Sequence, residues 1–340
     1  MNSPELAFQN ATESFLQKFD IYWNDAINAM GVQGMQLSTG NRLRPQICLW
    51  GYLTTVSPNA ILSHDYSTIA NVAVSIEMVH KASLLIDDWI DNDSERHGNP
   101  TFHVEHSPKQ AVLSALNMIG NAMERLENAF HDTTVLPHNY YLCLNTIIKT
   151  VCSMAKGALL ELQLQDTNLF NLQKIREITQ LETAEILGNS LLLGYYAGAN
   201  DVINPNIEKA FKEIGDKCGY LFQAFNDLEA FINPEKLIKH KGNLNFDYQS
   251  NRKNLAIAAL FEIARAEDQD TLRAADWETI MQMMDKYCVV DTMHMELDNV
   301  FLDLIEICDS HLVSEMHSDW RKGFQGFLAY VKKFAEARLK

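Results

Sequence analysis

Apolar residues recur every three or four positions along most of this chain, which is the spacing of one face of an α-helix. The spacing predicts helices over residues 4–29, 45–57, 65–91, 109–131, 138–166, 171–199, 205–231, 254–267, 276–311 and 316–338, with a break inside 276–311. No alternating run of apolar and polar residues is long enough to predict a β-strand. The pattern therefore predicts an all-α protein.

Three segments between these helices lack the helical spacing, at residues 31–43, 92–109 and 233–253. Loops of this length in compact proteins usually carry function or are disordered. No low-complexity linker divides the sequence into halves, and no internal repeat is present. We therefore expect one domain over residues 1–340.

The composition supports long helices and excludes two classes of partner. The chain has 15 glycines and 8 prolines among 340 residues, so residues that break helices are scarce. Lysine and arginine total 28 against 44 aspartates and glutamates, which gives a net charge of −16. This sign is unfavourable for binding a nucleic acid backbone or an anionic lipid surface. A small anionic substrate would need local arginines, lysines or a bound metal ion.

The sequence also bears on the cellular compartment. The 6 cysteines form no C-x-x-C pair and no disulfide-like spacing, so we expect free thiols in a reducing environment. Residues 1–15 lack the basic segment and apolar core of a secretory signal. The uncharged stretch at residues 186–200 is shorter than the roughly 20 apolar residues of a transmembrane segment. These features predict a cytoplasmic protein with no transmembrane segment.

Three aspartates end the apolar helix that precedes residue 92. Asp87 and Asp91 are four residues apart, so both project from one face of the helix, with Cβ atoms about 5–6 Å apart. Two such carboxylates can hold a hard cation such as Mg²⁺, which prefers oxygen ligands and often shares them with substrate phosphates. An acidic helix end that is simply solvated is the alternative interpretation.

Polar residues on both sides of the aspartates favour a functional site. Four of them interrupt the part of the helix that should be buried: Glu77, His80, Lys81 and Ser83. His80 precedes Asp87 by two turns, about 10.5 Å along the axis, on nearly the same stripe. A histidine satisfied within the core is the alternative. Arg96 follows in the loop, and an arginine beside carboxylates that bind Mg²⁺ indicates a diphosphate site.

A longer string of residues surrounds these positions. It reads Asp87-Asp88-Trp89-Ile90-Asp91-Asn92-Asp93-Ser94-Glu95-Arg96-His97-Gly98-Asn99-Pro100. This string resembles the first aspartate-rich motif of the trans-isoprenyl diphosphate synthases, or polyprenyl synthetases, D-D-x-x-D-x-x-x-x-R-R-G-x-P, with His97 at the second arginine. Gly40-Asn41-Arg42-Leu43-Arg44-Pro45 is similar to the family's G-K-R-L-R-P, and Glu77 with His80 to its E-x-x-H. The resemblance runs from about residue 36 to residue 260.

A second stretch, Phe222-Gln223-Ala224-Phe225-Asn226-Asp227-Leu228-Glu229-Ala230, resembles the family's F-Q-x-x-D-D-x-x-D but keeps one of its three aspartates. Asn226 stands at the first aspartate and Ala230 at the last. An asparagine offers one neutral carbonyl oxygen to a metal ion, so we expect weaker metal binding on this side of the site.

Several charged positions of the family also differ. Glu182 and Asn243 replace lysines on the allylic side, where Glu161 replaces an aspartate. On the side of isopentenyl diphosphate, Asn41 replaces a lysine and His97 an arginine. Because histidine is at most partly cationic near neutral pH, we expect this second anion site to be electrostatically weaker than the family's.

The resemblance implies an orthogonal helical bundle of the isoprenoid synthase type, with a central cleft and Mg²⁺ as the cofactor. It implies catalytic roles for Asp87, Asp88, Asp91 and Arg96, and metal ligation by Asp87, Asp91, Asn226 and Asp227. It implies that diphosphates bind Arg44, His80, Arg96, His97, Thr183, Gln223 and Arg252. Ala82 and Ser83 correspond to family positions where small residues go with products longer than roughly fifteen carbons.

The function that the resemblance implies is condensation of an allylic diphosphate with isopentenyl diphosphate into a longer trans-polyprenyl diphosphate, by a homodimeric enzyme. Two alternatives stay open. A terpene cyclase, or a transferase with another acceptor, would use an allylic diphosphate without isopentenyl diphosphate, as the changed second anion site suggests. A non-catalytic subunit of a heteromeric synthase would explain Glu182 and Ala230 as marks of lost activity.

Overall fold

The computed structural model of the protein describes residues 4–30, 40–56, 64–96, 98–131, 137–165, 171–199, 203–233, 254–273, 275–311 and 318–337. Its helices are α1 Pro4–Ala29, α2 Leu43–Leu53, α3 Ser67–Ile90, α4 Phe102–Glu105, α5 Pro108–His131, α6 Pro137–Gln165, α7 Leu172–Thr179, the π-helical turn η3 Gln180–Ala184, α8 Glu185–Gly198, α9 Pro205–Ile232, α12 Leu255–Ile263, α13 Ala266–Arg273, α14 Trp277–Lys286, α15 Val289–His311 and α16 Ser318–Glu336. Two short strands, β1 Glu95–Arg96 and β2 Asn99–Pro100, form an antiparallel hairpin. The prediction of an all-α fold is confirmed.

The predicted helices agree with the observed ones to within a few residues, with differences at three places. Residues 171–199 contain the π-helical turn η3 between α7 and α8. The helix predicted over 254–267 ends at Ile263, and α13 starts at Ala266. The expected break in 276–311 falls at Cys288, whose φ is 49°. The four-residue helix α4 was not predicted, because one turn is too short for a periodic pattern.

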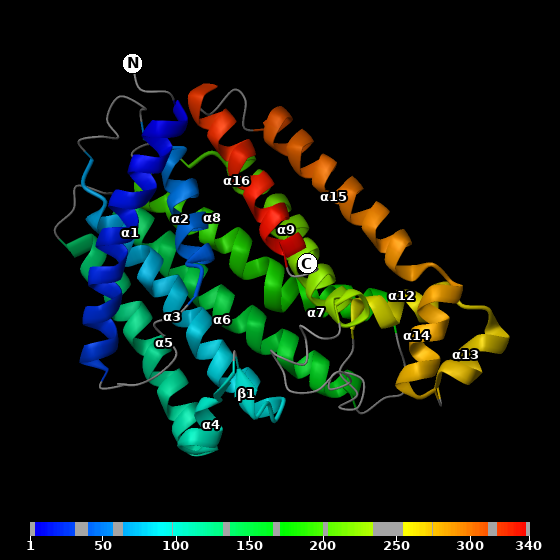
Figure 1. Cartoon of the computed structure of the whole chain (residues 1–340). Helices are drawn as coiled ribbons and strands as arrows, with labels where there is room; N and C mark the ends of the chain where they lie inside the picture. Colours follow the sequence, from blue (N-terminus) through cyan, green and yellow to red (C-terminus); the bar gives the residue numbers. More distant parts are fainter. Residues whose placement is uncertain are drawn as a thin grey trace.

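Two helices, α3 and α8, lie in the middle of the bundle. Figure 1 shows them between α1 and α5 on one side and α15 and α16 on the other. Helix α3 packs against α1, α2, α5 and α8, and α8 also packs against α2, α6 and α9. In the described part of the chain, α3 is the one helix long and apolar enough to cross a membrane, and 72% of that apolar window is buried inside the fold. A helix that is mostly buried in this way is a core helix of the fold.

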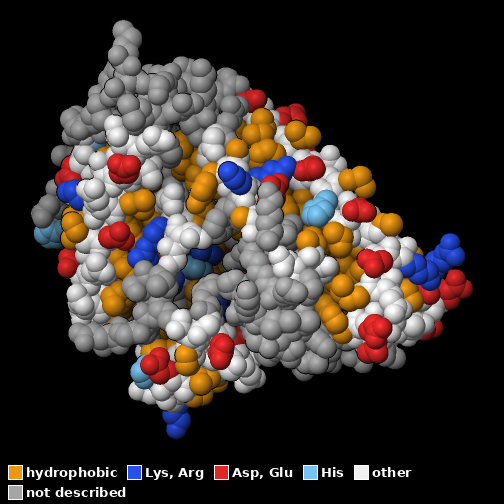
Figure 2. All heavy atoms as spheres, in the orientation of Figure 1, with side chains coloured by type: hydrophobic (Ala, Val, Ile, Leu, Met, Phe, Trp, Pro, Cys, Tyr) orange, Lys and Arg blue, Asp and Glu red, His pale blue; other side chains and the backbone are white. Residues whose placement is uncertain are grey.

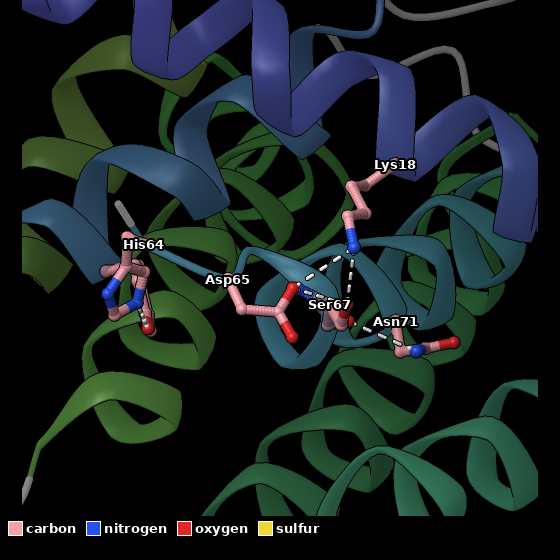
Figure 3. A network of polar contacts seen from close by, with 6 residues as sticks. Lys18, His64, Asp65, Ser67 and Asn71 are labelled. Carbon is pink, nitrogen blue, oxygen red and sulfur yellow. Dashed lines mark hydrogen bonds and ion pairs between the residues drawn. The ribbon is translucent and has the colours of Figure 1, made fainter. Parts of the chain in front are cut away.

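A polar network attaches α1 to the beginning of α3 (Figure 3). Lys18 Nζ lies 3.1 Å from Asp65 Oδ1 and 3.0 Å from Ser67 Oγ. The Ser67 amide donates to the same Asp65 oxygen at 3.1 Å, and Asn71 Nδ2 donates to the Ser67 carbonyl oxygen at 3.1 Å. Because Lys18 and Asp65 are well exposed, this pair orients the helices more than it stabilises them.

Helices α2 and α8 approach each other so closely that two positions require glycine. A Cβ atom at Gly51 would overlap the backbone carbonyl oxygen of Leu191, and one at Gly194 would overlap that of Cys48. Backbone atoms cannot move aside as a flexible side chain can. The contact therefore fixes the position of α2, which carries Arg44, relative to the core.

We expect Gly51→Ala to destabilise the protein, because the added methyl group meets backbone atoms of α8. Overpacking of this kind costs about 1–3 kcal/mol, and each kcal/mol lowers the melting temperature by about 2 °C in a protein of this size. Gly120→Ala in α5 is the matched control, since nothing lies within 4 Å of the added atom. Thermal unfolding followed by circular dichroism should show a decrease for the first variant and none for the second. Equal melting temperatures would contradict the close approach.

Candidate active site

Helix α3 ends in a motif that the sequence encodes at Asn92. Asn92 has a φ of 55°, the left-handed conformation that asparagine tolerates better than most residues. The amide of Asn92 donates to the Trp89 carbonyl oxygen at 3.2 Å, and the amide of Asp93 donates to that of Asp88 at 2.9 Å. This pair of bonds is a Schellman motif, which closes a helix. The helix therefore stops directly after the aspartates, all of which lie in its last two turns.

Carboxylates at the C-terminal end of a helix are disfavoured by the helix dipole, and the last turn of α3 contains no basic residue. The compensating charge comes from Arg96 on the hairpin. Its Nε donates to Asp88 Oδ1 at 2.7 Å, its Nη2 contacts the same oxygen, and Nη2 lies 3.8 Å from Asp87 Oδ2. Burial lowers the pKa of Arg96, but the bond to Asp88 and the nearby carboxylates outweigh it and raise the pKa. Arg96 is thus held as a permanent cation beside the aspartates.

The aspartates suit a divalent cation that is shared with a substrate. Asp87 is exposed and Asp91 half-buried on the same helical face, while Asp88 is buried and bound to Arg96. Among the described residues, no three His, Cys, Asp or Glu side chains are grouped so as to hold a metal ion by themselves. A pair of carboxylates fits Mg²⁺, which commonly takes one or two protein carboxylates and completes its shell with water and phosphate oxygens.

Asp227 on α9 is already engaged in the fold. It is 5% exposed, its Oδ1 accepts from Gln223 Nε2 at 2.8 Å, and its Oδ2 accepts from the Leu255 amide at 2.7 Å. The second bond fixes the start of α12, together with the N-cap side chain of Asn254. The neighbouring Asn226 is half-buried. Metal ligation by Asn226 and Asp227 therefore stays a prediction.

The π-helical turn η3 brings two predicted substrate-binding residues together. Thr183 Oγ1 donates to Gln223 Oε1 at 3.3 Å, and Gln223 in turn donates to Asp227. A π-helical turn adds one residue to a helical turn and often marks a functional site. Thr183, Gln223 and Asp227 thus form one chain of hydrogen bonds between η3 and α9.

Glu182, also on η3, was not among the predicted site residues. It packs over Gly157 of α6, where a Cβ atom would lie 2.5 Å from the Glu182 Cγ. Burial raises the pKa of Glu182 to about 9, with further contributions from Glu161 and Asp87. At neutral pH the Glu182 carboxyl is therefore protonated and adds no negative charge beside the aspartates. It stands where the resembled family has lysine.

Basic side chains gather near the middle of α3. Arg42 Nη1 and Lys81 Nζ each lie 3.9 Å from Glu77 Oε1. Burial, followed by the charges of Arg44, Lys81 and Arg96, holds the pKa of His80 well below its usual value. His80 is therefore a neutral imidazole at physiological pH. Figure 2 shows lysine, arginine and histidine side chains in a hollow on the face drawn.

We call Arg42, Arg44 and Lys81 the cation cluster. Substrate binding is predicted for Arg44 from the motif it lies in, whereas the motifs assign no role to Lys81. The sequence feature that could have indicated a role for Lys81 is that a lysine interrupts an otherwise buried helix. The other predicted positions are Ala82, which is buried, and Ser83, whose Oγ donates to the His80 carbonyl oxygen at 2.8 Å. His97 and Arg252 lie outside the described residues.

This chain matches one protein-family model and several known proteins. A family model described as polyprenyl synthetase matches residues 28–286. The chain is 25% identical over 197 residues to a geranylgeranyl diphosphate synthase of Saccharolobus solfataricus, a match that covers 58% of this chain and 56% of that protein. The match thus spans little more than half of that relative.

Solved structures resemble the whole fold. The geranylgeranyl pyrophosphate synthetase of Pyrococcus horikoshii aligns with a TM-score of 0.74 at 20% identity and covers 97% of both chains. The geranylgeranyl pyrophosphate synthase of Corynebacterium glutamicum, complexed with isoprenyl diphosphate and magnesium, has a TM-score of 0.67 at 17% identity and covers 97% of this chain and 98% of that one. At these identities the likeness establishes the fold, and the predicted isoprenoid synthase type of bundle is confirmed.

The raised pKa of Glu182 predicts a specific dependence of stability on pH in the metal-free protein. Between pH 4.5, the ordinary pKa, and about 9, the folded state keeps a proton that the unfolded state has lost, so rising pH destabilises the fold across this window. Glu182→Gln removes the effect. The melting temperature of Glu182→Gln should increase relative to that of wild type as the pH rises from 5 to 9. Above pH 9 the difference between the two melting temperatures should stay constant.

The exposed Glu267 in α13 provides the control, because its side chain is 74% exposed. Glu267→Gln should follow the wild-type melting curve at every pH. A Glu182→Gln variant whose offset from wild type does not change with pH would show that Glu182 titrates normally.

Proposed function

Since this chain belongs to the polyprenyl synthetase family, whose model matches residues 28–286, we propose that it is a prenyltransferase. The proposed reaction condenses an allylic diphosphate with isopentenyl diphosphate, in the presence of Mg²⁺, to give a longer trans-polyprenyl diphosphate. The observation that carries the proposal is that two separate groups of charged residues lie along α3, with members from α3 and from the segments beside it. One contains the aspartates with Arg96, and the other is the cation cluster with His80 about two turns earlier.

Asp87 and Asp91 are the proposed Mg²⁺ ligands. Magnesium, when bound there, stabilises the negative charge that develops on the leaving diphosphate. Arg96 is held by Asp88 beside Asp87, where its guanidinium can donate to the same diphosphate. The magnesium and isoprenyl diphosphate in the Corynebacterium glutamicum structure are consistent with this arrangement. Protonated Glu182 adds no negative charge beside these groups.

The second group supports isopentenyl diphosphate as the acceptor. Arg44 and the neutral imidazole of His80 can donate hydrogen bonds to a diphosphate, and Lys81 adds a further cation. A cyclase that acts on one allylic diphosphate would have no use for a second anion site. The proximity of two such sites allows the isopentenyl double bond to attack the allylic cation once the first diphosphate leaves.

An assay with farnesyl diphosphate separates this proposal from its alternatives. With Mg²⁺ and isopentenyl diphosphate, we expect elongation to longer diphosphates. Turnover of farnesyl diphosphate alone, unaffected by isopentenyl diphosphate, would indicate the cyclase or the transferase to another acceptor. Turnover under neither condition would indicate the non-catalytic subunit. One domain, a homodimer and a cytoplasmic location stay predictions of the sequence.

Replacing either proposed Mg²⁺ ligand, as in Asp87→Ala or Asp91→Ala, should lower kcat by about 10³-fold or more while the helical fold is kept. The matched control is Asp270→Ala on α13, since the Asp270 side chain is 81% exposed and its 2.8 Å ion pair with Arg273 lies on the surface, where such pairs contribute little to stability. Steady-state rates and far-ultraviolet circular dichroism measure the two effects. Full activity in Asp87→Ala would rule out metal binding at this position.

Product length should depend on Ala82, one turn before the aspartates, where the growing hydrocarbon chain is proposed to pass. Each isoprene unit adds roughly 4–5 Å, so the aromatic ring in Ala82→Phe should stop elongation earlier without abolishing turnover. Chromatography of the products measures the shift. Unchanged product length together with a lower melting temperature would mean that Ala82 only allows close helix packing.

A further inference from the structure

Asp227 connects the end of α9 with the beginning of α12. It lies in the last two turns of α9, and α12 packs against α9 (Figure 1). Asn254 Nδ2 donates to the Asp227 carbonyl oxygen at 3.2 Å, and the Leu255 amide donates to Asp227 Oδ2 at 2.7 Å. Asn254 also caps α12, since its Oδ1 accepts from the amides of Ala256 and Ile257. The main chain and the side chain of Asp227 therefore both hold the start of α12.

The other carboxylate oxygen of Asp227 fixes the orientation of a side-chain amide. Gln223 Nε2 lies 2.8 Å from Asp227 Oδ1. Because an ionised carboxylate can only accept hydrogen bonds, the atom of Gln223 that faces it has to be the amide nitrogen. The Gln223 oxygen then accepts from Thr183 Oγ1 at 3.3 Å, the longer of these two bonds. The carboxylate of Asp227 thus determines which end of the Gln223 amide faces η3, and in which direction the Thr183 hydroxyl donates.

The surroundings of Asp227 leave little room for a metal ion. The residue is 5% exposed, and each of its carboxylate oxygens already accepts a hydrogen bond. Mg²⁺ gives up its water molecules reluctantly and usually keeps several of them. Ligation through Oδ2 would also break the bond of the Leu255 amide, which belongs to a residue with 0% exposure and cannot turn to water instead. The bonds that hold α12 and Gln223 therefore compete with metal ligation by Asp227.

The chain of hydrogen bonds leads from the core towards the site. Asp227 is buried, whereas Gln223 and Thr183 are half-buried. The residue before Thr183 on η3 is Glu182, which interacts electrostatically with Asp87. The far end of the chain is therefore near the proposed Mg²⁺ ligand Asp87. A change in the direction of the bonds at Asp227 would alter the Thr183 hydroxyl at this end.

We propose that Asp227 is a positioning residue and does not ligate the metal ion. Its carboxylate orients Gln223, and through Gln223 the hydroxyl of Thr183, while it anchors the start of α12. This role takes the place of the metal ligation that the resemblance implies for Asp227. The inference rests on the proposed function only where turnover is measured, because the hydrogen bonds themselves do not depend on a substrate.

Binding of Mn²⁺, followed by electron paramagnetic resonance, tests whether Asp227 is a ligand. The full-length protein is titrated in the presence of an allylic thiodiphosphate that resists ionisation. Asp227→Asn should bind Mn²⁺ within about threefold of wild type, whereas Asp87→Ala, which removes a proposed ligand, should bind it roughly tenfold more weakly or worse. A loss of affinity in Asp227→Asn as large as that in Asp87→Ala would overturn the assignment.

An exchange of the two facing groups tests the positioning directly. In the double variant that combines Gln223→Glu with Asp227→Asn, the new amide can donate to the new carboxylate and still accept from the Leu255 amide. The new carboxylate can still accept from Thr183, and the net charge is unchanged. Gln223→Glu alone sets two carboxylates face to face, so its melting temperature in EDTA should fall below that of wild type. The double variant should recover most of this loss.

Steady-state kinetics with Mg²⁺ separates positioning from a purely structural role. Asp227→Asn alone allows the Gln223 amide to turn round, so that its nitrogen faces Thr183 and the hydroxyl donates elsewhere. We expect kcat/KM for the allylic substrate to fall about tenfold with little change in melting temperature, and the double variant to stay within about threefold of wild type. The double variant alone carries the test if Asp227→Asn does not fold. A double variant that does not fold, or that is no more active than Asp227→Asn, would overturn the assignment, because a carboxylate one turn away cannot replace a metal ligand.

Failure of the proposed function gives a different result. If the wild-type protein does not elongate an allylic diphosphate, the prenyltransferase proposal fails, and the melting temperatures of Gln223→Glu and the double variant still decide the role of Asp227. If elongation occurs but the double variant melts as low as Gln223→Glu, the prenyltransferase proposal stands and the assignment of Asp227 fails.

Discussion

Balance of charge along α3 is the constraint on which the site depends. This helix is surrounded by α1, α2, α5 and α8, yet it carries Glu77, Lys81 and Asp88 among its buried residues. Each buried charge must be neutralised within a few ångströms, because the interior screens charge poorly. Arg96 does so for Asp88, and Arg42 and Lys81 surround Glu77. Along α3, carboxylates thus gather at the end of the helix, and basic side chains gather beside its middle.

The changed residues of this chain fit the same balance. Glu182 stands where the resembled family has a cation, and its burial beside Glu161 and Asp87 keeps it protonated, so the negative end gains no further charge. Asn41 stands in the loop before α2 where the resembled family has lysine, and the Lys81 ammonium on α3 lies beside Gly40 of that loop. Considered separately, the changes at Glu182 and Asn41 suggest a site that has lost its activity. Their surroundings in the fold are instead consistent with an active site whose charged groups are arranged differently from those of the resembled family.

The sequence predicted the helices because helical periodicity depends on local spacing, whereas the role of the first motif stays a prediction. The break at Cys288 and the closure of α3 at Asn92 also arise within a few residues. The use of both Asp227 oxygens was not predictable, since the Leu255 amide is 28 residues away along the chain. The protonation of Glu182 likewise depends on α3 and α6, which only the fold brings beside it. The protonation state of a buried carboxyl depends on its distances to other charged groups, and the sequence alone does not give these distances.

A crystal structure with Mg²⁺, isopentenyl diphosphate and an allylic thiodiphosphate that resists ionisation would locate both diphosphates relative to α3. We expect a metal ion on Asp87 and Asp91 that shares oxygens with the thiodiphosphate. We expect the second diphosphate at Arg44, His80 and Lys81. Both diphosphates bound at the aspartates, or a second diphosphate far from Lys81, would contradict the division of α3 into a metal-binding end and an anion-binding middle.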